Sequence, residues 1–159
     1  METIYFDRIG ELKKEKKFIE KKLNIKIKIN EKNVIFSGEP LNEYDASLVL
    51  DAINFGFPAR TAILLKDEEM MFKKISIKEF SRKKRLEIVR GRLIGTKGKT
   101  KRVLEEISGC KVIIKDNMVG IIGAAESIEY IVTAITNLIR GTKQSNVYKY
   151  LEKIKKIKL

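Results

Sequence analysis

An internal repeat at an offset of 85 residues constrains this chain more than any other feature of its sequence. Three landmarks recur at that offset: Phe18-Ile19-Glu20 and Val103-Leu104-Glu105, Gly38 and Gly123, and Gly56 and Gly141. A repeat at fixed spacing is typical of one supersecondary unit that occurs twice. Because two units within 159 residues each bury a limited core, we expect them to pack together. The repeat predicts a first unit at residues 1–69 and a second at 70–159.

Apolar periodicity predicts the elements of the first copy. They are strands at 2–6, 25–29 and 34–36, helices at 10–23 and 40–54, and a shorter helix after Phe57-Pro58. Isoleucines alternate with lysines from 25 to 29, as in a strand buried on one side. Tyr44, Leu48 and Ala52 follow at a spacing of four, so we expect them on the buried face of their helix.

The second copy repeats this order with an additional helix and loop. Its predicted elements are a strand at 71–77, helices at 82–90, 100–107 and 128–139, and a hairpin at 112–122. Ser81 is a candidate N-cap for the first of these helices, with the basic run Arg82–Arg85 in its opening turn. A last amphipathic helix carries Val147 and Leu151. The fold class is therefore α+β, with two three-stranded sheets, helices on one face of each, and a C-terminal helix.

The loop of the second copy has the composition of an anion site. Gly95 and Gly98 bracket Thr96 and Lys97, and glycine allows positive φ and close approach of a ligand. The helix that follows directs its free N–H groups and the positive end of its dipole at this loop. Four cations add full charges: Lys97, Lys99, Lys101 and Arg102. The pattern suits phosphate, although Gly-x-x-Gly alone is also compatible with a plain structural turn.

The sequence contains no motif that supports an enzyme activity. Gly98-Lys99-Thr100 resembles the end of a P-loop, but the glycine required five positions before Gly98 is replaced by Leu93. The chain has no histidine, and one cysteine, Cys110, can form neither a zinc site nor an internal disulfide. We therefore expect no enzyme activity, no metal and no cofactor.

Charge points to nucleic acid. The chain carries 34 Lys and Arg against 21 Asp and Glu, for a net charge of +13. A lysine-rich surface can also reflect a heat-adapted host. Position argues against that reading, because from Lys78 to Arg102 there are 11 basic residues and two acidic ones. No signal-type or membrane-length apolar run is present, so we expect a cytoplasmic protein.

The order helix, glycine loop, helix, hairpin, helix resembles the KH family, which implies two type I KH-like units and four nucleotides lying across the loop. Three stretches resemble more particularly the tandem-KH ribosome-assembly family of Dim-type, or partner-of-Nob, factors. They are Val89–Gly95, Ile121–Gly123 and the tail Arg140–Glu152. The short chain, with no nuclear-type extension, is expected to be an archaeal member.

The resemblance implies a function in ribosome maturation. It implies binding of single-stranded RNA, in the 3′ region of small-subunit rRNA, together with a PIN-domain endonuclease of the Nob type. Archaeal relatives also imply the alpha subunit of translation initiation factor two as a partner. The alternative is a protein adapter in translation or ribosome assembly, in which both units are interaction surfaces.

The expected RNA-binding residues combine the loop, the cations around it and an apolar floor. They are Arg92, Ile94, Gly95, Thr96, Lys97, Gly98, Lys99, Lys101, Arg102, Val112 and Ile114. In the first copy the repeat pairs this loop with Gly10–Lys13, so either the second glycine is absent or several loop residues are lost. The lysines at 13–17 either contact RNA or form a solvated helix face. We expect the first unit to act mainly as a scaffold or protein-binding surface.

Overall fold

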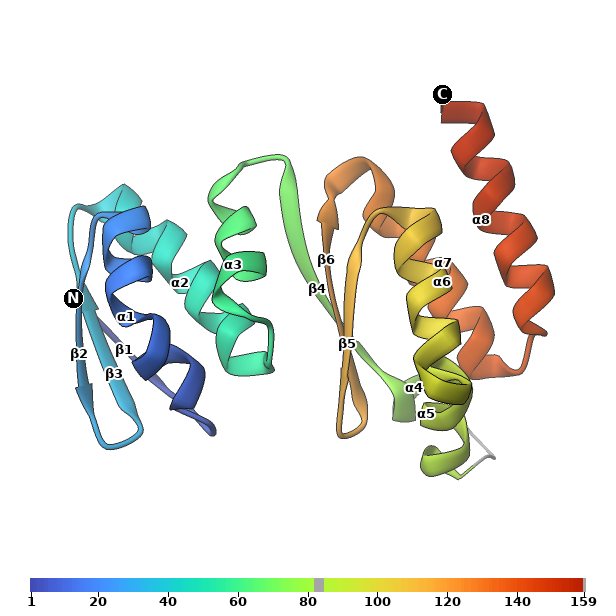
Figure 1. The fold of residues 1–159 in the computed structure, drawn as a ribbon, viewed down its shortest axis with the longest axis horizontal. Coiled ribbons are helices and arrows are strands. Elements are labelled where there is room, and N and C mark those ends of the chain that lie inside the picture. Colours follow the sequence, from blue (N-terminus) through green and yellow to red (C-terminus); the bar gives the residue numbers. More distant parts are fainter. Residues whose placement is uncertain (82–84, 159) are drawn as a thin grey trace. The chain divides into compact units, whose positions relative to one another are not determined.

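The computed structural model describes residues 1–81 and 85–158, and the chain divides into two compact units, Met1–Phe72 and Lys73–Leu159 (Figure 1). Each unit contributes a three-stranded sheet of the same topology, with the order β1-β3-β2 in one sheet and β4-β6-β5 in the other. The first strand of the second sheet, β4 (Met70–Ser76), runs across the boundary between the units. The predicted α+β class with two three-stranded sheets is confirmed.

The first unit is a short strand followed by helix, hairpin and helix. Its elements are β1 (Glu2–Tyr5), α1 (Gly10–Leu23), β2 (Lys26–Asn30), β3 (Asn33–Ser37), α2 (Pro40–Phe55), α3 (Ala59–Ala62) and the 3-10 turn η1 (Ile63–Lys66). In the antiparallel register Ile27 lies opposite Phe36, and both side chains are buried. The alternating isoleucines therefore face the core, as the period of two predicts.

Helix α2 buries Ala52 of the expected stripe and exposes the other two residues. Tyr44 and Leu48 are 61% and 37% exposed, while Val49 and Ile53 are buried. The helix has apolar residues on more than one side, so a spacing of four fits two stripes. The helix α1, the strand β3 and the turn η1, which contact α2, determine which stripe enters the core.

The second unit contains the additional helix and loop. Its remaining elements are α4 (Ile77–Phe80), α5 (Leu86–Ile94), the 3-10 turn η2 (Thr96–Gly98), α6 (Lys99–Ser108), β5 (Lys111–Lys115), β6 (Met118–Ala124), α7 (Ala125–Arg140) and α8 (Gln144–Lys158). Ser81 does not cap the helix before the loop, because it ends α4 and α5 begins only at Leu86. Of the predicted basic run at 82–85, Arg85 is extended and residues 82–84 lie outside the described residues.

Helix α8 completes the core of the second unit. It packs on α6 and α7 and buries Val147 and Leu151 to 2% and 3% exposure. The predicted apolar stripe of α7 is confirmed, with Ile128, Ile131 and Ile135 buried in the same core. No helix among the described residues is long and apolar enough to cross a membrane.

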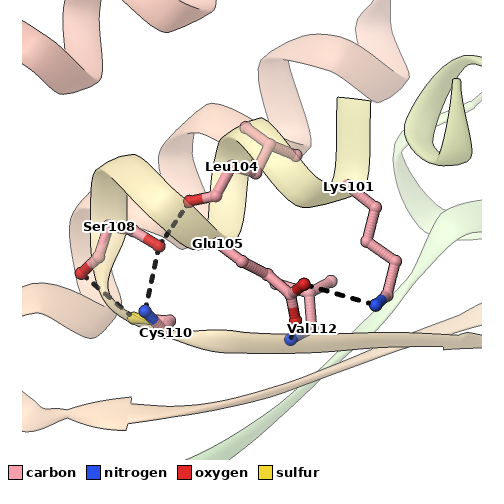
Figure 2. A network of polar contacts seen from close by, with 6 residues as sticks. All are labelled: Lys101, Leu104, Glu105, Ser108, Cys110 and Val112. Atoms are coloured by element: carbon pink, nitrogen blue, oxygen red, sulfur yellow. Dashed lines mark hydrogen bonds and ion pairs between the residues drawn. The ribbon is translucent and has the colours of Figure 1, made fainter. Parts of the chain in front are cut away.

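The duplication extends to individual hydrogen bonds. In the first unit Glu20 Oε2 accepts a 2.8 Å bond from the backbone N–H of Ile27, and in the second Glu105 Oε2 accepts one of 2.9 Å from Val112 (Figure 2). Both pairs keep the offset of 85 residues. Each carboxylate also faces the lysine four residues earlier in its helix. One carboxylate thus ties helix to strand in both copies.

The turns repeat as well. Backbone φ is positive at three pairs of positions with the same offset: Asn24 and Gly109, Glu31 and Asp116, and Gly56 and Gly141. The first two pairs end the helix and form the hairpin, so the chain reverses at equivalent points in both units. The repeat predicted from the sequence is confirmed at the level of backbone geometry.

Cys110 is a buried residue, as its place before a strand predicts. Its side chain is 1% exposed, and burial raises the pKa of the thiol, an effect that a hydrogen bond with Ser108 opposes (Figure 2). A Cβ added at Gly123 would lie 3.0 Å from Cys110 Cβ. A glycine at this position therefore allows β6 to approach Cys110, which lies between α6 and β5.

Candidate nucleic-acid interface

The loop between α5 and α6 is a tight turn built on positive backbone angles. Gly95 has φ +77°, Lys97 φ +54° and Gly98 φ +74°. The N–H of Gly95 donates to Gly91 O at 2.8 Å, and the N–H of Gly98 donates to Gly95 O at 3.1 Å. Non-glycine residues seldom adopt positive φ, so Lys97 is held in an unusual conformation by the glycines around it.

The two glycines serve different purposes. A Cβ on Gly95 would lie 2.6 Å from the backbone nitrogen of Thr100, so the start of α6 packs directly on this residue. A Cβ on Gly98 would meet no atom within 4 Å. Gly95 therefore closes the turn from inside, while Gly98 faces open space that a ligand could occupy.

The electrostatic setting favours an anion. Thr96, Lys97 and Lys99 are exposed, and the first turn of α6 carries no acidic residue. Helix α6 has ten residues, so its dipole adds partial positive charge at the loop. The structure thus combines exposed cations with a helix N-terminus at the turn that the sequence singled out.

Two expected RNA-binding cations are engaged within the protein. Arg92 donates from both terminal nitrogens, to Leu138 O and to Thr142 O, each at 2.7 Å. Lys101 lies 3.4 Å from Glu105 Oε1, and this pair has its counterpart in the first unit, which has no glycine loop. Arg92 therefore joins α5 to the end of α7, and Lys101 belongs to the duplicated helix-to-strand contact.

The three residues expected to form the apolar floor differ in their exposure in the structure. Ile94 is 38% exposed, and Ile114 is half-buried on β5. Val112 is 2% exposed and lies in the core, where it contributes its backbone N–H to Glu105. Of the three, Ile94 and Ile114 offer apolar surface to a base, and Val112 does not.

The first unit has no equivalent of this site. Within residues 1–72, all of them described, β1 leads through Phe6–Ile9 into α1, and no helix and glycine turn precede α1. Residues 10–13, which the repeat pairs with the loop, are the opening turn of α1 itself. There Glu11 Oε2 accepts a 2.8 Å bond from the N–H of Ala59. By the same offset Glu11 is the counterpart of Thr96, so a carboxylate bonded within the protein replaces an exposed residue of the turn.

The structure contains a groove beside the loop that the sequence did not predict. It has a volume of about 470 Å³, and its lining includes Ile88 and Gly91 of α5 and Gln144 and Tyr148 of α8. The relevant signal in the sequence was Gly91, which directly follows the predicted helix 82–90 and lies inside α5 in the structure, where a glycine usually has a packing or binding reason. The sequence does not predict that α8 lines this groove, because α8 lies far from the loop along the chain and is brought beside it only by the fold.

Comparison with known proteins identifies the class. Residues 71–156 match the model of the second KH domain of PNO1, described as a eukaryotic-type KH domain, or KH domain type I. The second unit is thus a type I KH domain.

Relatives that match nearly the whole chain identify the family within this class of KH-domain proteins. A KH domain-containing protein of Methanocaldococcus jannaschii is 31% identical over 152 residues, which cover 91% of this chain and 67% of that protein. The crystal structure titled as an a/eIF2alpha–aDim2p–rRNA complex of Pyrococcus horikoshii OT3 contains a chain that is 36% identical, with a TM-score of 0.87 and coverage of 98% and 94%. The pre-rRNA-processing protein PNO1 of Phaeosphaeria nodorum is 32% identical over 100 residues, 61% of this chain and 38% of its own length.

The chain belongs to the Dim2p/PNO1 family of KH-domain proteins. This is a non-catalytic, RNA-binding family. Its archaeal members match nearly all of this chain, whereas the fungal relative is more than twice as long as the matched part.

Proposed function

We propose that the protein binds single-stranded RNA across the Gly95–Gly98 turn, in the 3′ region of small-subunit rRNA during ribosome maturation. The observation that carries this proposal is the turn itself: exposed, open above Gly98, and placed at the N-terminus of α6. The N–H groups of Gly95 and Gly98 are bonded within the protein, so the exposed cations and the positive end of the α6 dipole are what suits the phosphates of about four nucleotides. Ile94 and Ile114 supply the apolar surface for bases.

The distribution of charge supports the second unit as the RNA-binding one. Residues 1–72 contain 12 Lys and Arg against 13 Asp and Glu, for a net charge of −1, and residues 73–159 contain 22 against 8, for +14. The excess positive charge of the chain therefore belongs to the unit with the glycine loop. Phosphate contacts by Lys and Arg dominate the affinity of most nucleic-acid binders.

The ribosomal assignment rests on relatives. The printed descriptions of the Pyrococcus complex and of the Phaeosphaeria protein name rRNA and pre-rRNA processing. By the family resemblance, the partners would be a PIN-domain endonuclease of the Nob type and the alpha subunit of translation initiation factor two, which the description of the Pyrococcus complex also names.

Charge reversal in the turn tests the proposal. The double variant Thr96→Asp/Lys97→Asp should bind a small-subunit rRNA 3′ fragment about a hundredfold more weakly or worse, because two carboxylates would face phosphates at short range. Aspartate tolerates the positive φ at position 97, so the variant should fold. Filter binding measures the affinity, and thermal unfolding verifies the fold.

The matched control is Thr96→Asn/Lys97→Asn, which has the same shape and the same tolerance of positive φ without the negative charge. It should lose no more than the contribution of one lysine. Equal affinity of the folded Asp variant and the wild type would refute RNA binding at this turn.

A second candidate function, the protein adapter, is favoured by one observation in the first unit. Leu41, Tyr44 and Leu48 lie on one stripe of α2 and are 73%, 61% and 37% exposed. Exposed apolar patches of this kind often bind protein partners. An adapter would retain its partner in the Asp variant of the turn and lose it in Leu41→Asp/Tyr44→Asp. RNA binding should respond in the opposite way to the two variants.

A further inference from the structure

The groove beside the loop opens on the side of α5 that carries Ile88 and Gly91. The expected base-binding residue Ile94 does not line it. Gly95, Thr96 and Lys99 do, so groove and phosphate turn share three residues. A strand held by its phosphates at the turn therefore has this groove next to it.

The chemistry of the groove suits a nucleotide. Tyr148 offers an aromatic ring and Ile88, 57% exposed, an apolar surface, which together can hold a base between them. Gln144 has an amide that both donates and accepts hydrogen bonds, as the edge of a base requires. The described residues that line the groove include two cations, Arg92 and Lys99, and no carboxylate.

The two walls of the groove are fixed relative to each other. Arg92 lies on α5, and its two 2.7 Å bonds reach Leu138 O near the end of α7 and Thr142 O just before α8. Helix α8 is further held by its buried Val147, next to Tyr148. The groove is thus preformed, and Arg92 acts on it as a positioning residue.

Gly91 keeps the groove open. A Cβ at this helical position would meet no atom within 4 Å. An apolar side chain here would project into free space on the α5 wall without displacing any part of the protein.

We infer that this groove between α5 and α8 is a second RNA subsite, which binds the base of a nucleotide flanking those held at the glycine turn. The inference rests on the proposed function and extends it, because it makes the C-terminal helix part of the RNA-binding surface. A single-stranded RNA longer than the turn can accommodate should gain affinity from Tyr148.

The experiment compares fluorescein-labelled RNA pools of randomised sequence, four and eight nucleotides long, by fluorescence anisotropy. Wild type should bind the longer pool more tightly. Tyr148→Ala should weaken the longer pool by about fivefold to a hundredfold, the range of base stacking on aromatic residues, and leave the shorter pool unchanged. Tyr150→Ala, on the same helix and outside the groove, is the matched control and should affect neither pool.

Gly91→Leu tests the groove without removing a contact. Leucine is a better helix former than glycine and has space at this position, so this variant should fold even if Tyr148→Ala does not. It should reproduce the loss for the longer pool by filling the groove. In the wild type, photo-crosslinking of a pool that contains 5-iodouridine should label Tyr148.

The outcomes separate the inference from the proposed function. Equal binding of both pools by wild type, Tyr148→Ala and Gly91→Leu would overturn the subsite and leave RNA binding at the turn intact. Capture of a peptide or protein segment by the groove, with no crosslink of RNA to Tyr148, would also overturn it. If the wild type binds neither pool, both proposals fall.

Discussion

At the scale of single residues, Gly95 and Gly98 share a positive φ and differ in their surroundings. Alanine at Gly98 costs about 1–2 kcal/mol for the left-handed backbone. Gly95, at φ +77° and ψ +169°, lies in a region that essentially only glycine adopts, and alanine there costs about 1–3 kcal/mol. At Gly95 the new Cβ also collides with the start of α6, and overpacking adds about 1–3 kcal/mol. We expect Gly95→Ala to be clearly the more destabilising in urea unfolding. Equal losses would mean that the contact between Gly95 and Thr100 does not constrain the turn.

The sequence predicted the residues of the turn better than the roles of the cations around it. Glycine spacing and a following helix are local features, so Gly95–Gly98 could be assigned without knowledge of the fold. Arg92 and Lys101 have the same charge as Lys97 and Lys99, but their partners lie on another helix or in a duplicated contact. Charge along a chain does not reveal which cations are already paired.

At the scale of elements, the repeated carboxylate allows the same experiment in two places. Glu105→Ala removes the acceptor of the Val112 N–H, and an unsatisfied backbone donor costs about 1–3 kcal/mol. Glu105→Gln keeps an oxygen acceptor and loses only the partly exposed pair with Lys101, worth about 1 kcal/mol or less. The amide of Val112 should therefore exchange with deuterium much faster in the Ala variant than in the Gln variant.

The first unit supplies the internal replicate. Glu20→Ala should accelerate exchange at Ile27, and Glu20→Gln should have a small effect, because the same 85-residue offset relates the two contacts. Glu106→Ala, at an exposed position next to Glu105, is the control for a general change in stability. Fast exchange in the Gln variants would show that the ion pair, rather than the hydrogen bond, joins helix to strand.

The buried face of a helix could be predicted where its apolar residues form a single stripe, and could not where they form two. Helix α7 has a single apolar stripe, so its core face follows from spacing. Helix α2 has apolar residues on several faces, and only its packing partners determine that Val49 is buried and Tyr44 exposed. Helix α5 begins at Leu86 rather than at residue 82, since a run of charged residues gives no periodic signal for its start.

At the scale of the whole molecule, the imbalance of charge between the units makes a prediction about salt. If about four to six phosphates are neutralised, the logarithm of affinity should fall with the logarithm of salt concentration at a slope of roughly −3 to −4. Because the first unit carries a net charge of −1 and the second +14, those contacts belong to the second unit. The slope should therefore depend on cations of one unit only.

Two double variants locate the contacts. Lys99→Ala/Arg102→Ala removes exposed charges at the start of α6 and should reduce the magnitude of the slope by about 1.4, which corresponds to two single-strand contacts. Lys13→Ala/Lys17→Ala removes two exposed charges from α1 and should leave the slope unchanged. Titration of a labelled single-stranded rRNA fragment at several salt concentrations measures both. A reduced slope in the α1 variant would instead place RNA on the first unit, where no glycine turn precedes α1.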